Sequence, residues 1–401
     1  MNQSSSDDWP VLARAGPSSV GSICSGSGAE GVCARHCRAQ TPLPPDYEGG
    51  ETMKKQLLFV AVIVTFILAG CAGRAAQPKT LKPITFQAAY LAQGNISFAA
   101  AYVAKEKGFF AEQGLDVTIE HSSPGGGEQL QRLAAKDIQF TTNTGANFVK
   151  LVAEQAPPFV AVSVLGQEGD HGILVLEDSG ITKIGDLAGK RVGYKSGEAI
   201  EPPWLLAMLK EAGLDLKSVE MVTVGFDPRV VLPDYGEGRV DALQVFKSNE
   251  PDTLQRAGYK VEVFKPEDYG VHFLGQLYIT HQDFIRDDPE MVRGFVRATL
   301  KGLEFILDPA NANEVTDIVM KYAGKDADRG HNEFMWKTEA QYVTSKDTEA
   351  VGLGYVSNEA WQEMMNVMVE YGSIKEPVAV DRFWDPQFVQ AVYKNGKLVW
   401  P

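Results

Sequence analysis

Cysteine is scarce in this chain of 401 residues: there are four, and three of them lie within the first 37 residues. The fourth, Cys71, directly follows a short hydrophobic segment. If the chain is cleaved before Cys71, no second cysteine remains, which excludes a disulfide, a cysteine-based zinc site and a free cysteine nucleophile in the mature protein. We therefore expect a hydrophobic core, rather than covalent cross-links, to stabilise the folded part.

Basic charge and catalytic motifs are also scarce. Lys and Arg number 38 against 52 Asp and Glu, and no basic run offsets the net charge of −14, so nucleic-acid binding is not expected. The six histidines lack the spacing of a zinc hydrolase, and neither a G-x-S-x-G elbow nor a G-x₄-G-K-[ST] phosphate loop occurs. A G-x-G-x-x-G pattern at 26–31 lacks the flanking strand and helix of a dinucleotide site. We expect no enzyme activity, no metal and no cofactor.

One hydrophobic run is present, and its 13 residues (57–69) fall short of the roughly 20 that span a bilayer. Lys54 and Lys55 precede it and Leu68-Ala69-Gly70-Cys71 ends it, which is the layout of a secretory signal. The last four residues match the lipobox of bacterial lipoproteins, in which the cysteine is lipidated and becomes the N-terminus. We expect Cys71 to carry the lipid, including palmitate, on the extracytoplasmic face of the cell membrane. The alternative is a single-pass anchor with an incidental cysteine.

The N-terminal part divides into three short segments. Residues 1–52 are rich in Gly, Ser and Pro, lack periodicity and precede a complete signal, so we expect a mis-assigned start or a disordered extension. Residues 53–70 are then the signal peptide, and 71–82 are a polar linker.

From residue 83 the chain alternates between β-rich and helical segments. Patterning predicts strands at 84–90, 116–120, 138–140, 160–165, 173–176, 191–194, 219–224, 242–246 and 259–264. Helices are predicted at 98–108, 129–135, 148–153 and 204–211, and the chain is mainly helical from Phe284 onward. Alternation of this kind predicts parallel sheets flanked by helices, an α/β fold. We expect lobe 1 at 83–172 plus 274–401, with the helical tail packed on it, and lobe 2 at 173–273.

Aromatic, amide and carboxylate side chains occur near several predicted strand ends, where open α/β sheets bind ligands. Flat aromatic walls with a few polar partners suit a heteroaromatic ligand. The alternative for each aromatic residue taken alone is burial in the core. The candidate ligand-binding residues are Tyr90, Asn95, Phe98, Asn143, Trp204, Phe246, Asn249, Glu250 and Tyr269.

Three segments resemble a known family. Residues 101–117 resemble the Y-x-A-x-E-K-G-[YF]-F-x-x-x-G-L-D-V signature of periplasmic-type substrate-binding proteins, which serve ABC importers for sulfonates, thiamine-type pyrimidines and riboflavin. Residues 184–193 are similar to the I-x-D-L-x-G-K-x-V-G segment of that superfamily, and 249–251 to its N-E-P segment. The resemblance implies a two-lobed type II periplasmic-binding-protein fold that closes on a small ligand. It also implies an ABC permease and its ATPase as partners of a monomeric protein.

The segment after the first predicted strand bears on the ligand. Residues 90–99 lack the tryptophan typical of the pyrimidine binders, and the N-x-x-F-A pattern beginning at Asn95 looks more like the riboflavin-binding branch. Sulfonate or taurine binders favour arginines around the cleft, of which we find few. Riboflavin is therefore our first expectation and a thiamine-type pyrimidine precursor the second. A pyrimidine-synthase-like enzyme is the alternative of a different class, but those relatives use a cysteine-rich segment that the mature chain lacks.

Overall fold

The computed structural model describes residues 80–123, 127–195 and 202–401. The predicted extension, signal peptide and lipidation site at Cys71 lie outside the described residues. In the part that is described, no helix is both long enough and apolar enough to cross a membrane. The described residues form one compact unit, built on two separate five-stranded sheets.

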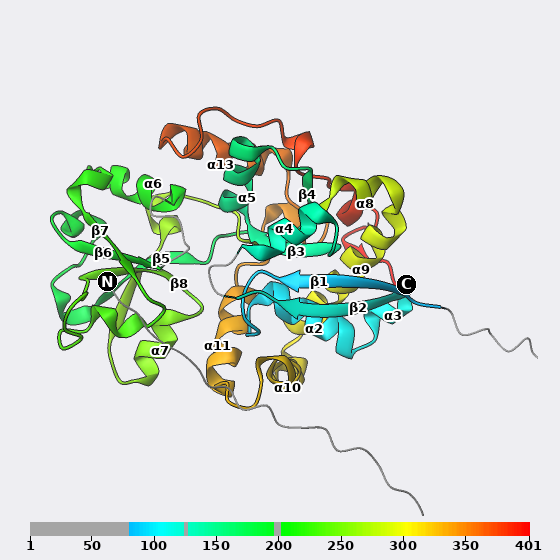
Figure 1. Cartoon of the computed structure of the whole chain (residues 1–401), viewed down its shortest axis with the longest axis horizontal. Helices are drawn as coiled ribbons and strands as arrows, with labels where there is room; N and C mark the ends of the chain where they lie inside the picture. Colours follow the sequence, from blue (N-terminus) through cyan, green and yellow to red (C-terminus); the bar gives the residue numbers. More distant parts are fainter. Residues whose placement is uncertain (1–79, 124–126, 196–201) are drawn as a thin grey trace, which may run out of the picture. The chain divides into compact units, whose positions relative to one another are not determined.

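The first sheet has the strand order β2-β1-β3-β10-β4, and β10 alone runs antiparallel to its neighbours. Its strands are β1 (Lys82–Ala88), β2 (Leu115–His121), β3 (Phe140–Thr144), β4 (Phe159–Val164) and β10 (Gln276–His281). With its helices and the C-terminal region it forms lobe 1, residues 80–164 and 276–401. Strands β1 and β2 are drawn in blue and cyan in Figure 1.

The second sheet has the order β7-β6-β8-β5-β9, and here β5 alone is antiparallel. Its strands are β5 (His171–Leu176), β6 (Arg191–Lys195), β7 (Glu220–Val224), β8 (Ala242–Phe246) and β9 (Val261–Phe264). With its helices it forms lobe 2, residues 171–264, drawn in green in Figure 1.

The sheets are mixed, whereas the sequence pattern predicted parallel ones, and the path of the chain explains the difference. The chain passes between the sheets twice, at 165–170 and at 265–275. The first residue of β5, His171, pairs with the last residue of β8, Phe246, and the first residue of β10 likewise pairs with the last residue of β3. A strand that receives the crossing chain therefore begins at the edge where the parallel strands end, so it runs in the opposite direction.

Strand β10 was missed by the sequence patterns. Five of its six residues are buried, so it shows no alternation of polar and apolar residues, and a short run of this kind is ambiguous. Its residue Tyr278 belongs to the core of lobe 1, where its ring lies 5.6 Å from Phe86 and 5.3 Å from Phe295. The Phe295 ring also stacks on Phe140 at 3.8 Å.

Helices cover both sheets. They are α2 (Ile96–Glu106), α3 (Phe109–Glu112), α4 (Glu128–Ala135), α5 (Gly145–Gln155), α6 (Pro203–Glu211), α7 (Glu250–Arg256), α8 (Gln282–Asp287), α9 (Pro289–Leu307), α10 (Ala312–Ala323), α11 (Arg329–Ala340), α12 (Lys346–Ala350), α13 (Asn358–Glu370) and α14 (Gln387–Gln390). A hairpin of β11 (Tyr393–Lys394) and β12 (Lys397–Leu398) lies near the C-terminus.

The helical C-terminal region packs on lobe 1, as the sequence pattern predicted. Helices α9, α10 and α11 contact α2, and α13 contacts α5. The start of α9 is also as expected, because the Asp288 side chain accepts a hydrogen bond from the backbone N–H of Met291. The region makes a second set of contacts that was not predicted: α11 touches α7 and α13 touches α6, both in lobe 2. The C-terminal helices therefore contribute to the junction between the two lobes.

Candidate functional site

A cavity of about 470 Å³ lies among residues of both lobes, within the range of small-molecule sites. It forms where the C-terminal ends of β1, β3, β6 and β8 come together, the edge at which open α/β sheets bind ligands. Seven of the nine candidate residues line it: Tyr90, Asn95, Phe98, Asn143, Phe246, Asn249 and Glu250.

The other two candidates, Trp204 and Tyr269, are not among the residues that line the described cavity. Trp204 is 4% exposed and stacks on the His171 ring at 5.5 Å, and Phe246 lies 4.6 Å from the same ring. Burial, aided by the charges of two nearby lysines, lowers the pKa of His171 to about 3, so the ring is neutral at physiological pH. Trp204 thus packs against His171, which in turn contacts Phe246 of the cavity wall. The hydroxyl of Tyr269 accepts a hydrogen bond from the backbone N–H of Ile184 at 3.3 Å.

A buried ion pair forms part of the lobe 2 wall. The Lys195 ammonium at the end of β6 lies 2.6 Å from the Glu250 carboxylate, and it also lies 4.8 Å from the centre of the Phe246 ring. The second carboxylate oxygen of Glu250 accepts the backbone N–H of Phe246 at 2.8 Å. Lys195 was not among our candidates, although it directly follows the predicted strand at 191–194 and that position was the available signal.

Helix α11 supplies part of the cavity wall, and none of its residues was among our candidates. His331, Met335 and Glu339 are spaced four residues apart, so they lie on one face of the helix. Met335 and Glu339 line the cavity, and His331 contacts residues at the start of α7. We expected this region to pack on lobe 1 alone, and nothing local in the sequence indicates the second contact.

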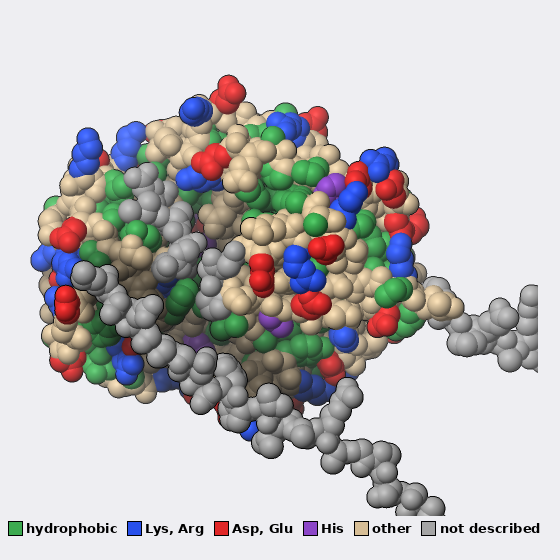
Figure 2. Space-filling view, in the orientation of Figure 1, with side chains coloured by type: hydrophobic (Ala, Val, Ile, Leu, Met, Phe, Trp, Pro, Cys, Tyr) green, Lys and Arg blue, Asp and Glu red, His purple; other side chains and the backbone are tan. Residues whose placement is uncertain are grey.

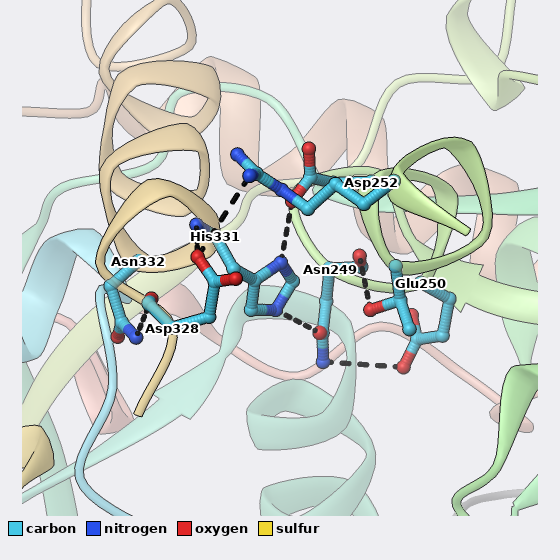
Figure 3. A network of polar contacts seen from close by, with 8 residues as sticks. Asn249, Glu250, Asp252, Asp328, His331 and Asn332 are labelled. Atoms are coloured by element: carbon cyan, nitrogen blue, oxygen red, sulfur yellow. Dashed lines mark hydrogen bonds and ion pairs between the residues drawn. The ribbon is translucent and has the colours of Figure 1, made fainter. Parts of the chain in front are cut away.

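His331 joins a polar network at the start of α7 (Figure 3). Its Nε2 lies 3.0 Å from Asn249 Oδ1, and its Nδ1 lies 2.7 Å from Asp252 Oδ2. The amide nitrogen of Asn249 lies 3.3 Å from Glu250 Oε1, so the network reaches the ion pair in the cavity wall.

A second network, centred on Glu339, connects the lobes at the cavity wall. The carboxyl group accepts hydrogen bonds from Asn95 Nδ2 at 3.1 Å and from the backbone N–H of Ile96 at 2.9 Å. The Ser248 hydroxyl lies 3.0 Å from Glu339 Oε1 and also contacts the Asp170 carboxyl group. Burial raises the pKa of Asp170 to about 7; burial and the neighbouring Asp170 raise that of Glu339 well above its usual range.

The lining is rich in amide groups, which can donate and accept hydrogen bonds at the edge of a heterocycle. The amide residues are Gln93, Asn95, Gln129, Asn143, Asn147, Gln155, Asn249 and Gln276. The described lining contains no arginine. Within the described ranges there is also no cluster of three or more His, Cys, Asp or Glu residues that could hold a metal ion. The amide groups of the lining therefore suit it to binding a polar ring.

Comparison with known proteins identifies the family. Residues 95–312, more than half of the chain, match the model of the family described as NMT1/THI5 like. The chain belongs to the NMT1/THI5-like family.

Three similar proteins are two binding proteins and one synthase. The riboflavin-binding protein RibY of Chloroflexus aurantiacus is 26% identical, over 84% of this chain and 98% of its own. A formylaminopyrimidine-binding protein of Halalkalibacterium halodurans is 25% identical, over 70% of this chain and 83% of its own. A 4-amino-5-hydroxymethyl-2-methylpyrimidine phosphate synthase of Saccharomyces cerevisiae is 28% identical, but over only 53% of this chain and 64% of its own.

Solved structures show the fold. The periplasmic aliphatic sulphonate binding protein SsuA of Escherichia coli aligns with a TM-score of 0.58 at 16% identity, over 77% of this chain and 92% of its own. The protein thus has the periplasmic-binding-protein fold, as the sequence resemblance implied.

Proposed function

We propose that this protein is the lipid-anchored, extracytoplasmic solute-binding component of an ABC importer and that it captures a heteroaromatic vitamin, with riboflavin as the favoured ligand. The observation that carries the proposal is the cavity between the lobes, which combines aromatic rings from both lobes with a lining rich in amides.

The aromatic residues suit stacking against a flat ring system. Tyr90 and Phe98 come from lobe 1, and Phe226 and Phe246 come from lobe 2. The Tyr90 and Phe226 rings already lie 6.3 Å apart, which is within the range of aromatic pairing. A ring system entering the cavity would therefore meet aromatic surface on both sides.

The charges of the lining favour a neutral ligand over an anion. The Lys195 ammonium is engaged by Glu250 at 2.6 Å, and Lys150 lies 3.8 Å from Glu154. A sulfonate would need a cation or a bidentate arginine to replace its hydration. The described lining offers no arginine, so riboflavin fits the site better than a sulfonate does.

A thiamine-type pyrimidine precursor is the second candidate, favoured by the similarity to the formylaminopyrimidine-binding protein. A pyrimidine is a smaller ring and would use fewer of the aromatic contacts. The match to the yeast synthase covers about half of this chain. The described residues that line the cavity include no cysteine, so we do not propose catalysis.

Delivery to a permease follows from hinge closure. The two crossing segments, 165–170 and 265–275, join lobes that each supply part of the cavity wall. Rotation about these segments would enclose the ligand and present a closed form to the permease and its ATPase. On the face drawn in Figure 2, acidic and basic side chains are interspersed.

The test is a fluorescence titration of the chain from residue 72 onward with riboflavin, because stacking on aromatic side chains quenches flavin emission. Thermal-shift measurements with formylaminopyrimidine, thiamine and taurine accompany it. Saturable quenching supports the proposal. No response to riboflavin together with a thermal shift from formylaminopyrimidine would favour the second candidate, and a shift from taurine alone would overturn both.

A further inference from the structure

The imidazole ring of His331 lies between two hydrogen-bonding groups of lobe 2. Nδ1 faces Asp252 Oδ2 at 2.7 Å and Nε2 faces Asn249 Oδ1 at 3.0 Å (Figure 3). The side chain of His331 is 20% exposed and that of Asp252 is 8% exposed, so water competes little for these contacts. Asn249 lines the cavity, whereas His331 is not among its lining residues.

The partners determine which atoms carry protons. Asp252 Oδ2 also accepts a hydrogen bond from Arg256 Nε at 2.6 Å, so Asp252 is a carboxylate and His331 Nδ1 must donate to it. At the other end, Glu250 Oε1 is held by the Lys195 ammonium and can only accept from Asn249. The end of the Asn249 amide that faces Glu250 is therefore its nitrogen.

It follows that the amide oxygen of Asn249 faces His331 Nε2, and this nitrogen must also carry a proton. Both ring nitrogens donate, which makes His331 an imidazolium in this arrangement. A neutral ring could make only one of the two bonds. If the Asn249 amide were turned so that its nitrogen faced the ring, its oxygen would lie 3.3 Å from Glu250 Oε1, and neither oxygen could donate a hydrogen bond.

We propose that His331 is a positioning residue of the ligand site: as an imidazolium it holds the Asn249 amide in one orientation, so that the second N–H of that amide is directed at a carbonyl group of the ligand. The choice of a carbonyl as acceptor rests on the proposed function, because riboflavin carries ring carbonyls and formylaminopyrimidine carries a formyl carbonyl. The protonation of His331 does not depend on it.

The charges around the ring are balanced. From α7, Asp252 and Arg256 face it, with Glu250 and the Lys195 ammonium of β6 one contact further away. Next to its own helix, Asp328 accepts the backbone N–H of His331 and lies 3.8 Å from Arg256. Raising the pH until the ring loses a proton breaks one of its two bonds and frees the Asn249 amide to turn.

The first test needs no ligand. In ¹⁵N-labelled protein from residue 72 onward, the two ring nitrogens of His331 should both be protonated in the folded state. The side-chain amide signal of Asn249 should shift when the ring loses a proton. In His331→Gln, which can donate but cannot titrate, the Asn249 signal should be independent of pH. A ring that is singly protonated in the folded state, or an unchanged pH response of Asn249 in the variant, would overturn the proposal.

The second test uses riboflavin and formylaminopyrimidine as probes. Wild-type affinity should fall by up to about tenfold when the ring loses a proton, and His331→Leu should lose about the same factor at every pH. His331→Gln should recover binding and remove the pH dependence, which a merely structural role would not produce. Lys337→Gln, which changes an exposed residue of the same helix outside the cavity, should keep the wild-type profile. Binding that does not change with pH would overturn the proposal. Failure of wild-type protein to bind either probe would contradict the proposed function, and the spectroscopic test would still decide the role of His331.

Discussion

The Lys195 ammonium lies 2.6 Å from the Glu250 carboxylate, and the two side chains are 4% and 5% exposed. Two charges removed from water in this way are stabilised only if their partners are complete. Here the carboxylate also accepts N–H groups from Phe246 and Asn249, and the ammonium lies over the Phe246 ring. The pair therefore adds no net charge to the part of the lobe 2 wall that it forms.

We predict that Lys195→Met lowers the free energy of unfolding by about 3–5 kcal/mol, because it leaves the buried Glu250 carboxylate without its partner. Urea denaturation followed by circular dichroism measures the change. The double variant Lys195→Met/Glu250→Gln should recover part of the loss, since no uncompensated charge remains.

The matched control is Lys260→Met. Lys260 lies 3.8 Å from Glu177 and is 82% exposed, so its loss should change the free energy of unfolding by less than about 0.5 kcal/mol. Equal effects of the two single variants would contradict the role that we assign to the buried pair.

Local patterns in the sequence predicted much of this site because they depend on neighbours in the chain. The alternation of strands and helices placed Tyr90, Asn143 and Phe246 near strand ends, and the ends of several strands meet at one edge. The cap at Asp288 could be read from two consecutive residues.

What the sequence did not reveal depends on contacts between distant segments. Glu339 is hydrogen-bonded to Asn95, which lies 244 residues away in the sequence, and His331 to Asn249, which lies 82 residues away. No periodicity encodes such a contact. Strand β10 was missed for a related reason: burial on both faces removed its alternation, and only its place between β3 and β4 explains it.

A close approach between helices α2 and α9 gives a prediction about stability. A Cβ atom at Gly302 would lie 2.3 Å from the backbone oxygen of Ala100. Gly302→Ala should therefore force the helices apart and lower the free energy of unfolding by about 1–3 kcal/mol.

Gly294→Ala, in the same helix, is the control for this change. There the nearest atom would be the Cβ of Gln113 at 3.3 Å, and the gain in helix propensity of about 1 kcal/mol offsets the tighter contact. Thermal unfolding of both variants measures the difference. A Gly302→Ala protein as stable as Gly294→Ala would show that the helices can separate at little cost.

The aromatic pair at the cavity gives a prediction about the ligand. Phe226 is 44% exposed and lies 6.3 Å from Tyr90, so it can rotate to cover a bound ring. We predict that Phe226→Ala weakens riboflavin binding by up to about tenfold and reduces the quenching of its fluorescence, because one stacking partner is lost. Tyr235→Ala, at a residue that is 41% exposed and not part of the lining, should leave both unchanged. The same loss in both variants would argue against stacking at Phe226.

The lipobox gives a prediction about processing. Because Leu68-Ala69-Gly70-Cys71 follows a charged and then an apolar segment, we expect the mature protein to begin at a lipidated Cys71. Mass spectrometry of membrane-extracted protein should find a blocked N-terminus at this residue. Cys71→Ser should prevent lipidation and leave the protein as precursor or release it. A peptide that spans Gly70-Cys71 in the mature pool would contradict this expectation.

The neighbouring carboxyl groups of Asp170 and Glu339 give a prediction about pH. The Ser248 hydroxyl has one hydrogen, yet it contacts an oxygen of Asp170 and an oxygen of Glu339. One of these two carboxyl groups must therefore hold a proton in the folded protein. Burial raises the pKa of Asp170 to about 7, against the partial opposing effects of the Ser248 hydrogen bond and the Lys247 charge. In the unfolded chain an aspartate titrates near pH 4.

Between about pH 4 and pH 7 the folded state holds a proton that the unfolded state has released, so the free energy of unfolding falls as the pH rises through this window. In Asp170→Asn this contribution disappears, because the amide cannot titrate and can still accept the Ser248 hydroxyl. Other carboxyl groups, such as Glu106 beside Lys321, have lowered pKa values and contribute in the opposite direction at more acidic pH. The measurement is therefore the difference between wild type and variant in urea denaturation at a series of pH values. Wild type should lose stability relative to Asp170→Asn as the pH rises, whereas the exposed-site control Asp178→Asn should run parallel to wild type. Parallel curves for wild type and Asp170→Asn would show that no proton is held at Asp170.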